Sequence, residues 1–332
     1  DHARNTGGDG CSEVEDHPPT GFSSDPAKYV MIPTHARARH PIVVDRLDRL
    51  AKYVEASPLT SIDKGDPGIG VVTVGIAHHY VKEVLPDASI LKLGMSNPLP
   101  LDTIRAFAAT VERLFVVEEL EPFVEDALLA AGITVEGKEH FPRTGELGPD
   151  AVHDGFAGAG VLDPRAQPEP GPETVVRRPL LCAGCPHTGP YSILKRLEAI
   201  VAGDIGCYTL AALPPLSTMD TCVAMGSSIG MAAGLAASGG ASGPVVATIG
   251  DSTFLHGGIA GLMDAVYSKA DLPVLLLDHG TGAMTGGQEH PGTGVTLQGD
   301  ESPAVDLVAL CRSVGVEDVV GVDPYDLAAT HR

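Results

Sequence analysis

The sequence lacks the features that mark a membrane or secreted protein. No run approaches the ~18 consecutive apolar residues that a membrane helix requires. The first residues, DHARNTGGDGCSEVEDHPP, do not have the basic-then-apolar order of a signal peptide. These absences predict no membrane contact and a cytoplasmic location.

Basic residues are also scarce, with 22 Lys and Arg against 43 Asp and Glu and a formal net charge of −21. A field of that sign repels nucleic acid and anionic lipid, so nucleic acid is excluded as a partner. We interpret the acidic surface as an aid to solubility. The six cysteines are unevenly placed and do not suggest a disulfide framework.

The composition of the 332 residues is typical of a globular protein, with 43% hydrophobic and 20% charged residues. The chain starts without Met and stops at DPYDLAATHR, where a helix is beginning, so we expect a fragment of a longer polypeptide. The predicted parts are a linker and helical connector (1–66), an α/β domain (67–150), a Pro/Gly-rich linker (151–178) and a second α/β domain (179–332).

Two blocks of the chain alternate short apolar runs with helical segments. Such alternation, with short connections, is typical of a parallel sheet covered by helices on both faces. The predicted fold class is therefore α/β with two parallel-sheet domains, preceded by an amphipathic helix over 38–57 and a Pro/Gly break over 57–68. The predicted strands are 68–75, 89–94, 113–120 and 133–139, then 200–206, 244–251 and 272–279.

The triplet Gly250-Asp251-Ser252 ends one predicted strand of the second block. His279 follows after 26 residues, 253–278, which hold one helix and one strand. Both ends of this unit emerge at the carboxyl edge of one sheet, where ligands bind in open α/β folds. There Asp251 and His279 could share a cation such as Mg²⁺, whose remaining ligands are phosphate oxygens. The alternative is that Asp251 only caps a helix and His279 is an ordinary loop residue.

A Gly/Thr-rich loop, GTGAMTGGQEHPGTG, comes directly after His279 and suits backbone contacts with a diphosphate. Gly257 and Gly258, at the start of the preceding helix, offer further N–H groups to an anion. The triplet, its spacing and this loop resemble the cofactor-binding motif of thiamine diphosphate enzymes.

Longer segments carry a more specific resemblance, among them LLCAGCPHTGPYSILKR, IGDSTFLHGGIAGLMDAVYSKADLPVLLLDHGTGAMTGGQEHPGTG and VTVGIAHHYVKEVLPDASILKLGMSNPLPLDTIRAFA. They resemble the large (α) subunit of indolepyruvate ferredoxin oxidoreductases, thiamine-dependent 2-oxoacid:ferredoxin oxidoreductases. The resemblance implies a transketolase C-terminal-like domain followed by a thiamine diphosphate-binding domain. It places the chain as a central fragment, with the pyrimidine-binding domain and its activating glutamate before Asp1 and a ferredoxin-like tail after Arg332.

The resemblance also implies roles for individual residues. Asp251, His279 and the carbonyl of Thr281 match the Mg²⁺ ligands, although the family usually has Asn in place of His279. Imidazole is a softer donor than an amide oxygen and suits Mg²⁺ poorly. The other residues expected near the cofactor are Gly250, Ser252, Thr285, Gly286, Gly287, Met225, Gly226 and His187.

Three cysteines form a second candidate metal site. Cys182 and Cys185 make a C-x2-C pair and Cys207 follows a predicted strand, a set that suits either an iron–sulfur cluster or zinc. The resemblance implies ligation of a [4Fe–4S] cluster, with the fourth ligand beyond Arg332; structural thiols are the alternative. Cys222 and Cys311 are predicted to lie in helices as buried small apolar residues.

Other polar residues give weaker signals. His187 either faces the diphosphate or is exposed at a helix start, and no role is assigned to His78 and His79. An acidic cluster at a strand end is interpreted as solvated or as pairing with a partner subunit; its members are Glu118, Glu119 and Glu121.

The function implied by the resemblance is the oxidative decarboxylation of arylpyruvates. Electrons would pass through clusters to ferredoxin, and coenzyme A would take the acyl group. The implied partners are a small (β) subunit in a hetero-oligomer, ferredoxin and a 2-oxoacid. The alternatives are another thiamine-dependent 2-oxoacid decarboxylase or oxidoreductase, including a non-redox enzyme without a cluster, and a cofactor-binding fragment that is inactive alone.

Overall fold

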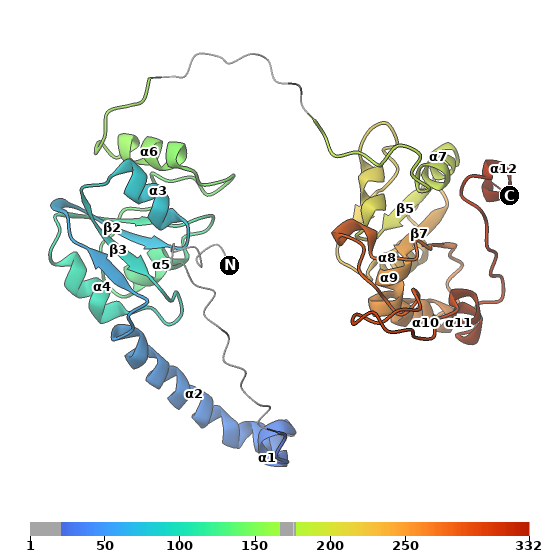
Figure 1. Cartoon of the computed structure of the whole chain (residues 1–332), viewed down its shortest axis with the longest axis horizontal. Helices are drawn as coiled ribbons and strands as arrows, with labels where there is room; N and C mark the ends of the chain where they lie inside the picture. The colour runs from blue at the N-terminus through green and yellow to red at the C-terminus, as the bar shows by residue number, and fades with distance from the viewer. Residues whose placement is uncertain (1–20, 167–174, 176, 332) are drawn as a thin grey trace. The chain divides into compact units, whose positions relative to one another are not determined.

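A computed structural model describes residues 21–166, 175 and 177–331, and it divides the chain into two compact units between Pro172 and Glu173. Each unit is built on its own four-stranded sheet, and Figure 1 shows strands of both sheets as arrows. Among the described residues no helix is both long and apolar enough to cross a membrane.

The sheet of the first unit has the strand order β1-β3-β2-β4. β2 (Asp66–Val74) runs parallel to β3 (Ala88–Leu93) and to β4 (Arg113–Val117). The structure confirms these three predicted strands. Each is an apolar run, and most of its residues are buried on both faces of the sheet.

The edge strand β1 (Ser61–Asp63) pairs antiparallel with β3, so the sheet is not wholly parallel as predicted. This strand falls in the segment interpreted as a Pro/Gly break. Gly65 lets the chain pass directly over the start of β3, since a Cβ there would lie 2.2 Å from the Asp87 carbonyl oxygen. The strand predicted over 133–139 is reduced to a single bridge between Phe115 and Glu136.

Helices cover both faces of this sheet. α3 (Ala77–Val84) and α6 (Pro149–Gly158) pack on one face, and α4 (Leu101–Ala108) and α5 (Phe123–Ala130) pack on the other. α6 lies where the composition predicts a linker. Its Phe156 is fully buried, with its ring 5.1 Å from that of Phe141 and 5.3 Å from that of Phe115. This aromatic contact holds α6 in the first unit and moves the end of the domain beyond 150.

The predicted acidic cluster is not uniformly solvated. Glu118 is buried, and its carboxylate accepts the N–H groups of Val124 and Glu125 at the start of α5. Burial raises the pKa of Glu118, and the two N–H bonds offset this only in part. Glu121 is exposed and pairs with Arg143. Glu118 is therefore a helix cap, which corrects the interpretation drawn from the sequence.

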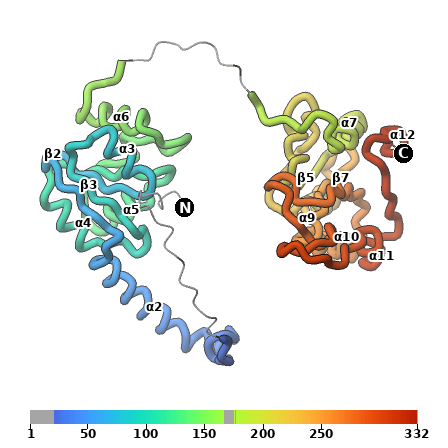
Figure 2. Tube along the Cα trace, viewed as in Figure 1, coloured from blue at the N-terminus to red at the C-terminus, as the bar shows by residue number. Residues whose placement is uncertain are grey.

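The amphipathic helix is found as α2 (Pro33–Glu55), preceded by the short α1 (Pro26–Tyr29). Val54 is the one buried residue of α2, which extends away from the sheet (Figure 2). The Glu55 carboxylate at its end accepts the N–H groups of Asp102 and Thr103, both at 2.9 Å, and so joins α2 to the first turn of α4.

The sheet of the second unit is wholly parallel, in the order β6-β5-β7-β8. Its strands are β5 (Ile200–Gly203), β6 (Thr221–Cys222), β7 (Val245–Gly250) and β8 (Val274–Leu277). The longer helices around it are α7 (Thr188–Arg196), α8 (Ser228–Ala237), α10 (Ile259–Tyr267) and α11 (Leu307–Ser313), and the chain ends in α12 (Leu327–His331).

Small residues in α8 and α10 allow these helices to pack closely on the sheet, around Ile229, Ala232 and Ile249. Cys311 lies in a helix, α11, as predicted, but it is half-buried and not fully buried. Cys222 lies in β6 and is exposed, so the prediction of a buried helical residue is wrong there. The strand β6 is only two residues long and leaves this side chain at the edge of the sheet.

Candidate functional site

The candidate site of the second unit lies at the carboxyl ends of three adjacent parallel strands. Asp204 follows β5, Asp251 follows β7, and Asp278 and His279 follow β8. Asp204 and Asp251 are both completely buried. Two buried carboxylates at neighbouring strand ends need many hydrogen-bond donors, and the backbone supplies them.

Asp251 is held by the segment that follows β8. Its Oδ2 accepts the N–H groups of His279 (2.9 Å) and Gly280 (2.8 Å), and its Oδ1 accepts the N–H of Ser252 (2.8 Å). The imidazole Nδ1 of His279 lies 2.9 Å from Oδ1. Although burial alone would raise the pKa of Asp251, its bonds with His279 and Ser252 hold that pKa well below the usual range.

A chain of contacts leads from Asp251 to a cysteine. The Nε2 atom of His279 lies 2.6 Å from Nε2 of His187, and Nδ1 of His187 lies 3.2 Å from Sγ of Cys185. His187 is buried and not exposed at a helix start. Burial and the neighbouring His279 lower its pKa to about 4, so it is neutral at pH 7.

A residue absent from the sequence predictions, His290, also reaches this carboxylate. Its side chain is 2% exposed, and its Nε2 lies 3.2 Å from Oδ2 of Asp251 without a hydrogen bond of its own. His290 stands in the Gly/Thr-rich loop, in GGQEHPG, where nothing in the spacing distinguishes it from other loop residues.

Asp204 is the second residue that the sequence predictions omitted. Both of its oxygens accept the Gly226 N–H at 2.9 Å, and Oδ2 also accepts the Ser228 N–H at 3.2 Å. Gly226 has a φ of +86°, and a Cβ there would lie 3.1 Å from the backbone of Gly257. The turn before α8 therefore requires glycine, and it leaves Met225 exposed.

The loop after β8 turns back on itself before His290. Gly286 and Gly287 have φ values of +113° and +85°, and their N–H groups donate to the carbonyls of Ala283 and Gly282. The hydroxyl of Thr285 bonds to Gln288. The carbonyl of Thr281 accepts the N–H of Ala283. The positive φ values at Gly286 and Gly287 are readily adopted only by glycine. The same loop begins at Gly280, whose N–H binds Asp251.

The three cysteines occupy different elements. Cys182 is exposed and Cys185 half-buried in the turn before α7, and Cys207 begins a short 3-10 helix, Cys207–Ala212. Within residues 21–166, 175 and 177–331, their sulfurs do not all lie within 4.8 Å of one another. Ligands of a single tetrahedral zinc ion, each ~2.3 Å from the metal, would be that close.

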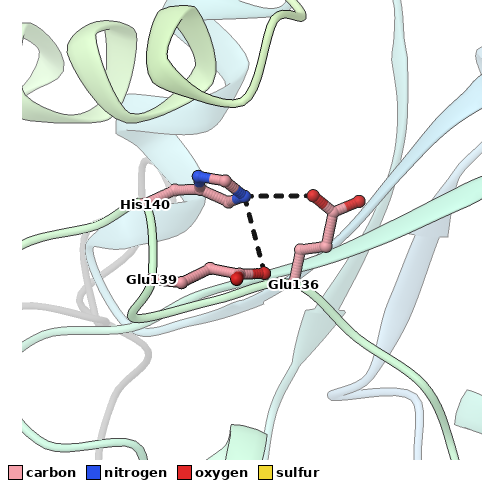
Figure 3. A group of neighbouring side chains, drawn as sticks. All are labelled: Glu136, Glu139 and His140. Carbon is pink, nitrogen blue, oxygen red and sulfur yellow. Dashed lines mark hydrogen bonds and ion pairs between the residues drawn. The ribbon is translucent and has the colours of Figure 1, made fainter.

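Among the described residues, one group of acidic and histidine side chains has ligand atoms that all lie within 4.8 Å of one another, and it lies in the first unit. It consists of Glu136, Glu139 and His140, with His140 between the two carboxylates (Figure 3). Arg113 already binds both oxygens of Glu136, at 2.8 and 2.6 Å. Because a guanidinium neutralises this carboxylate, we assign the group a structural role.

Comparison with known proteins finds a family that is similar to most of the second unit. Residues 204–331 match the family model described as thiamine pyrophosphate enzyme, C-terminal TPP binding domain. This segment holds the strand ends at Asp251 and His279 and the loop through His290. The second unit is therefore similar, over residues 204–331, to the cofactor-binding domain of thiamine pyrophosphate enzymes.

Along nearly its whole length the chain is similar to indolepyruvate oxidoreductase subunit IorA, as the sequence resemblance predicts. It is 36% identical to the protein from Archaeoglobus fulgidus, over 95% of this chain and 52% of that protein. It is 35% identical to the protein from Thermococcus kodakarensis, over 93% of this chain and 53% of that protein. The chain thus spans about half the length of the curated relatives it matches.

A solved thiamine diphosphate-dependent 4-hydroxybenzoylformate decarboxylase from Rhodococcus jostii RHA1 aligns with 86% of the chain and 61% of its own, at 16% identity and a TM-score of 0.32. At that score no residues are equated between the two.

Proposed function

We propose that the chain is part of a thiamine diphosphate-dependent 2-oxoacid oxidoreductase of the indolepyruvate type. Such an enzyme decarboxylates an arylpyruvate, passes two electrons to ferredoxin and transfers the acyl group to coenzyme A. The observation that carries the proposal is the buried Asp251 carboxylate, which lies beside His279 at adjacent strand ends within the segment that matches thiamine enzymes.

The residues of this site fit a diphosphate and a divalent cation. Asp251 and the carbonyl of Thr281 are oxygen ligands of the kind that Mg²⁺ takes, and phosphate oxygens would complete its shell. Gly286 and Gly287 give the loop a backbone that a phosphate can approach closely. Gly250 and Ser252 flank the carboxylate, and the turn at Met225 and Gly226 forms the neighbouring wall. When bound, thiamine diphosphate supplies the carbanion chemistry of decarboxylation.

The protein's own part is to hold and orient the cofactor. The backbone N–H groups of Ser252, His279 and Gly280 fix the Asp251 carboxylate before any cation arrives, which reduces the cost of ordering the site. Asp204 fixes the Gly226 turn in the same way. The similar proteins are named as a subunit of an oxidoreductase, so we propose that the chain acts in a hetero-oligomer with a small (β) subunit, in the cytoplasm.

The electron path would begin at a [4Fe–4S] cluster held by Cys182, Cys185 and Cys207. The contact from Cys185 through His187 to His279 supports this proposal, because it joins one proposed cluster ligand to the cofactor site. A non-redox thiamine enzyme would not need these cysteines, so iron content separates the two functions.

The test is the iron content of the protein purified without oxygen. The unmodified protein is expected to be brown and to bind thiamine diphosphate with a divalent cation. Replacement of Cys182, Cys185 and Cys207 by Ser should remove one cluster's iron and leave thiamine diphosphate binding intact, whereas Cys311→Ser should change neither. Zinc in place of iron, or unchanged iron in the triple variant, would contradict the proposed electron path.

A further inference from the structure

The boundary between β5 and β7 is the point where the strand order of the second sheet reverses. From β5 the chain continues to β6 on one side of this boundary, and from β7 it continues to β8 on the other. In open α/β sheets, ligands bind outside the carboxyl ends of the strands at such a switch point. A side chain that joins the two strand ends there is therefore placed to influence the proposed cofactor site.

Tyr208 is that side chain. Its hydroxyl accepts the N–H of Gly250, the last residue of β7, at 2.9 Å, and it donates to the carbonyl of Ile205, just beyond β5, at 3.3 Å. β5 itself pairs with β7 only as far as Ala247. The hydroxyl thus gives a hydrogen-bond partner to a buried backbone N–H beyond the last residue that β5 reaches.

The ring of Tyr208 lies against both histidines of the site. It stacks on the ring of His279, with 6.1 Å between centroids and 9° between planes, and its centroid lies 5.7 Å from that of His187. A Cβ on Gly250 would lie 3.0 Å from Cε1 of His279 and 3.1 Å from Cε1 of Tyr208. The strand end and the two rings are therefore in close contact, and Tyr208 is only 1% exposed.

We propose that Tyr208 is a positioning residue for the binding of thiamine diphosphate and its cation. Its hydroxyl fixes the backbone of Gly250, and Asp251 is the next residue along the chain. A carboxylate that is held in place before the ligand arrives loses less conformational freedom on binding, which raises the affinity. The proposal rests on the proposed function, because thiamine diphosphate is the ligand whose binding Tyr208 strengthens.

The test compares two substitutions that each remove one buried hydroxyl. Tyr208→Phe removes the bond to Gly250 and keeps the ring, and Tyr191→Phe is its matched control. Tyr191 is also fully buried, and its hydroxyl donates to Oγ1 of Thr248, in the same strand, at 2.8 Å. Both substitutions should lower stability by similar amounts, since each removes one buried hydrogen bond to β7. Only Tyr208 makes its bond at the strand end that precedes Asp251.

Two measurements are made on the purified chain, at a temperature where circular dichroism shows that all variants are folded. Calorimetric titration with thiamine diphosphate in excess Mg²⁺ should show about fivefold weaker binding to Tyr208→Phe, as expected for the loss of one hydrogen bond. Binding to Tyr191→Phe should be unchanged. In the cofactor-free chain, the backbone N–H groups that donate to Asp251 should exchange hydrogen faster in Tyr208→Phe than in the wild type or Tyr191→Phe.

The possible results separate this role from the proposed function. Wild-type affinity in Tyr208→Phe, an equal loss of affinity in Tyr191→Phe, or unchanged exchange of these N–H groups would overturn the role of Tyr208 while the proposed function stands. Absence of thiamine diphosphate binding in the wild type and in both variants would refute the proposed function. The exchange measurement alone would then decide whether Tyr208 fixes Asp251.

Discussion

Replacing Asp251 by Ala should destabilise the second unit in addition to removing cofactor binding. The carboxylate is fully buried and accepts three backbone N–H groups, from Ser252, His279 and Gly280. Each hydrogen bond to a charged group contributes about 1.5–3 kcal/mol, but losses within one network are not additive. We therefore expect Asp251→Ala to lower the free energy of unfolding by about 3–5 kcal/mol, the range seen when one member of a buried charge pair is removed.

Asp251→Asn refines this expectation. The amide keeps the volume of the side chain and one acceptor oxygen, but its NH2 group faces backbone donors. We expect it to cost about half as much as the alanine, on the order of 2 kcal/mol. Asp264→Ala, at an exposed position of α10, is the matched control and should change stability by less than about 0.5 kcal/mol.

The assay is guanidinium unfolding of the metal-free chain, followed by far-UV circular dichroism. The two units each have their own core, so two transitions are expected, and only that of the second unit should shift. If Asp251→Ala unfolds within about 0.5 kcal/mol of the wild type, the backbone bonds to this carboxylate do not hold the strand ends together, and its role is confined to ligand binding.

Three further predictions concern other residues. Between pH 6.5 and 4 the unfolded chain binds a proton at His187 that the folded chain, with a pKa of about 4, does not. The free energy of unfolding should therefore decrease as the pH is lowered through this window. A His187→Gln variant titrated in parallel should show a smaller decrease. Phe156→Ala should destabilise the first unit by about 3–5 kcal/mol in guanidinium unfolding, whereas Phe22→Ala, at a side chain that is 80% exposed, should have little effect. Glu118→Ala should cost about 1–2 kcal/mol through loss of the α5 cap, and Glu119→Ala, the control at an exposed neighbour, should cost little in the same unfolding assay.

Each of these predictions has a clear contrary result. An unchanged pH slope would mean that His187 is not protected from protonation in the folded chain. A Phe156→Ala variant as stable as Phe22→Ala would place α6 outside the core. Equal effects of Glu118→Ala and Glu119→Ala would show that the acidic cluster is solvated throughout.

The sequence predicts those parts of the fold that depend on local pattern. β2, β3, β4, β7 and β8 are apolar runs between turn residues, and such runs form buried parallel strands wherever helices cover both faces. β1 and β6 are too short to have a pattern, since their pairing depends on neighbours that are distant in sequence. α6 is rich in Gly and Ala and resembles a linker, and only the aromatic neighbours of Phe156 reveal that it is packed.

The candidate site likewise contains some residues that the sequence pattern predicts and others that it does not. The spacing between Asp251 and His279 predicts that they lie together, and the structure places them 2.9 Å apart; their roles as metal ligands stay predictions. His290 could not be found from spacing because it reaches the site through an irregular loop. Asp204 lies at the end of β5, but its role depends on its bond to the Gly226 turn, which is distant in sequence. The role of the three cysteines also stays a prediction: Cys182 and Cys185 lie in the turn before α7, whereas Cys207 begins a separate 3-10 helix.

The helix α2 should be protected from hydrogen exchange in a steep gradient along its length. At its last residue, the Glu55 carboxylate is tied to two N–H groups of α4, and Val54 is buried beside it. Towards Pro33 the side chains are mostly exposed, and Pro41 removes one backbone hydrogen bond from the middle. Amides near the start of α2 should thus exchange through local fraying, while those near Glu55 should exchange only when the first unit opens as a whole. One helix would then report two different opening energies.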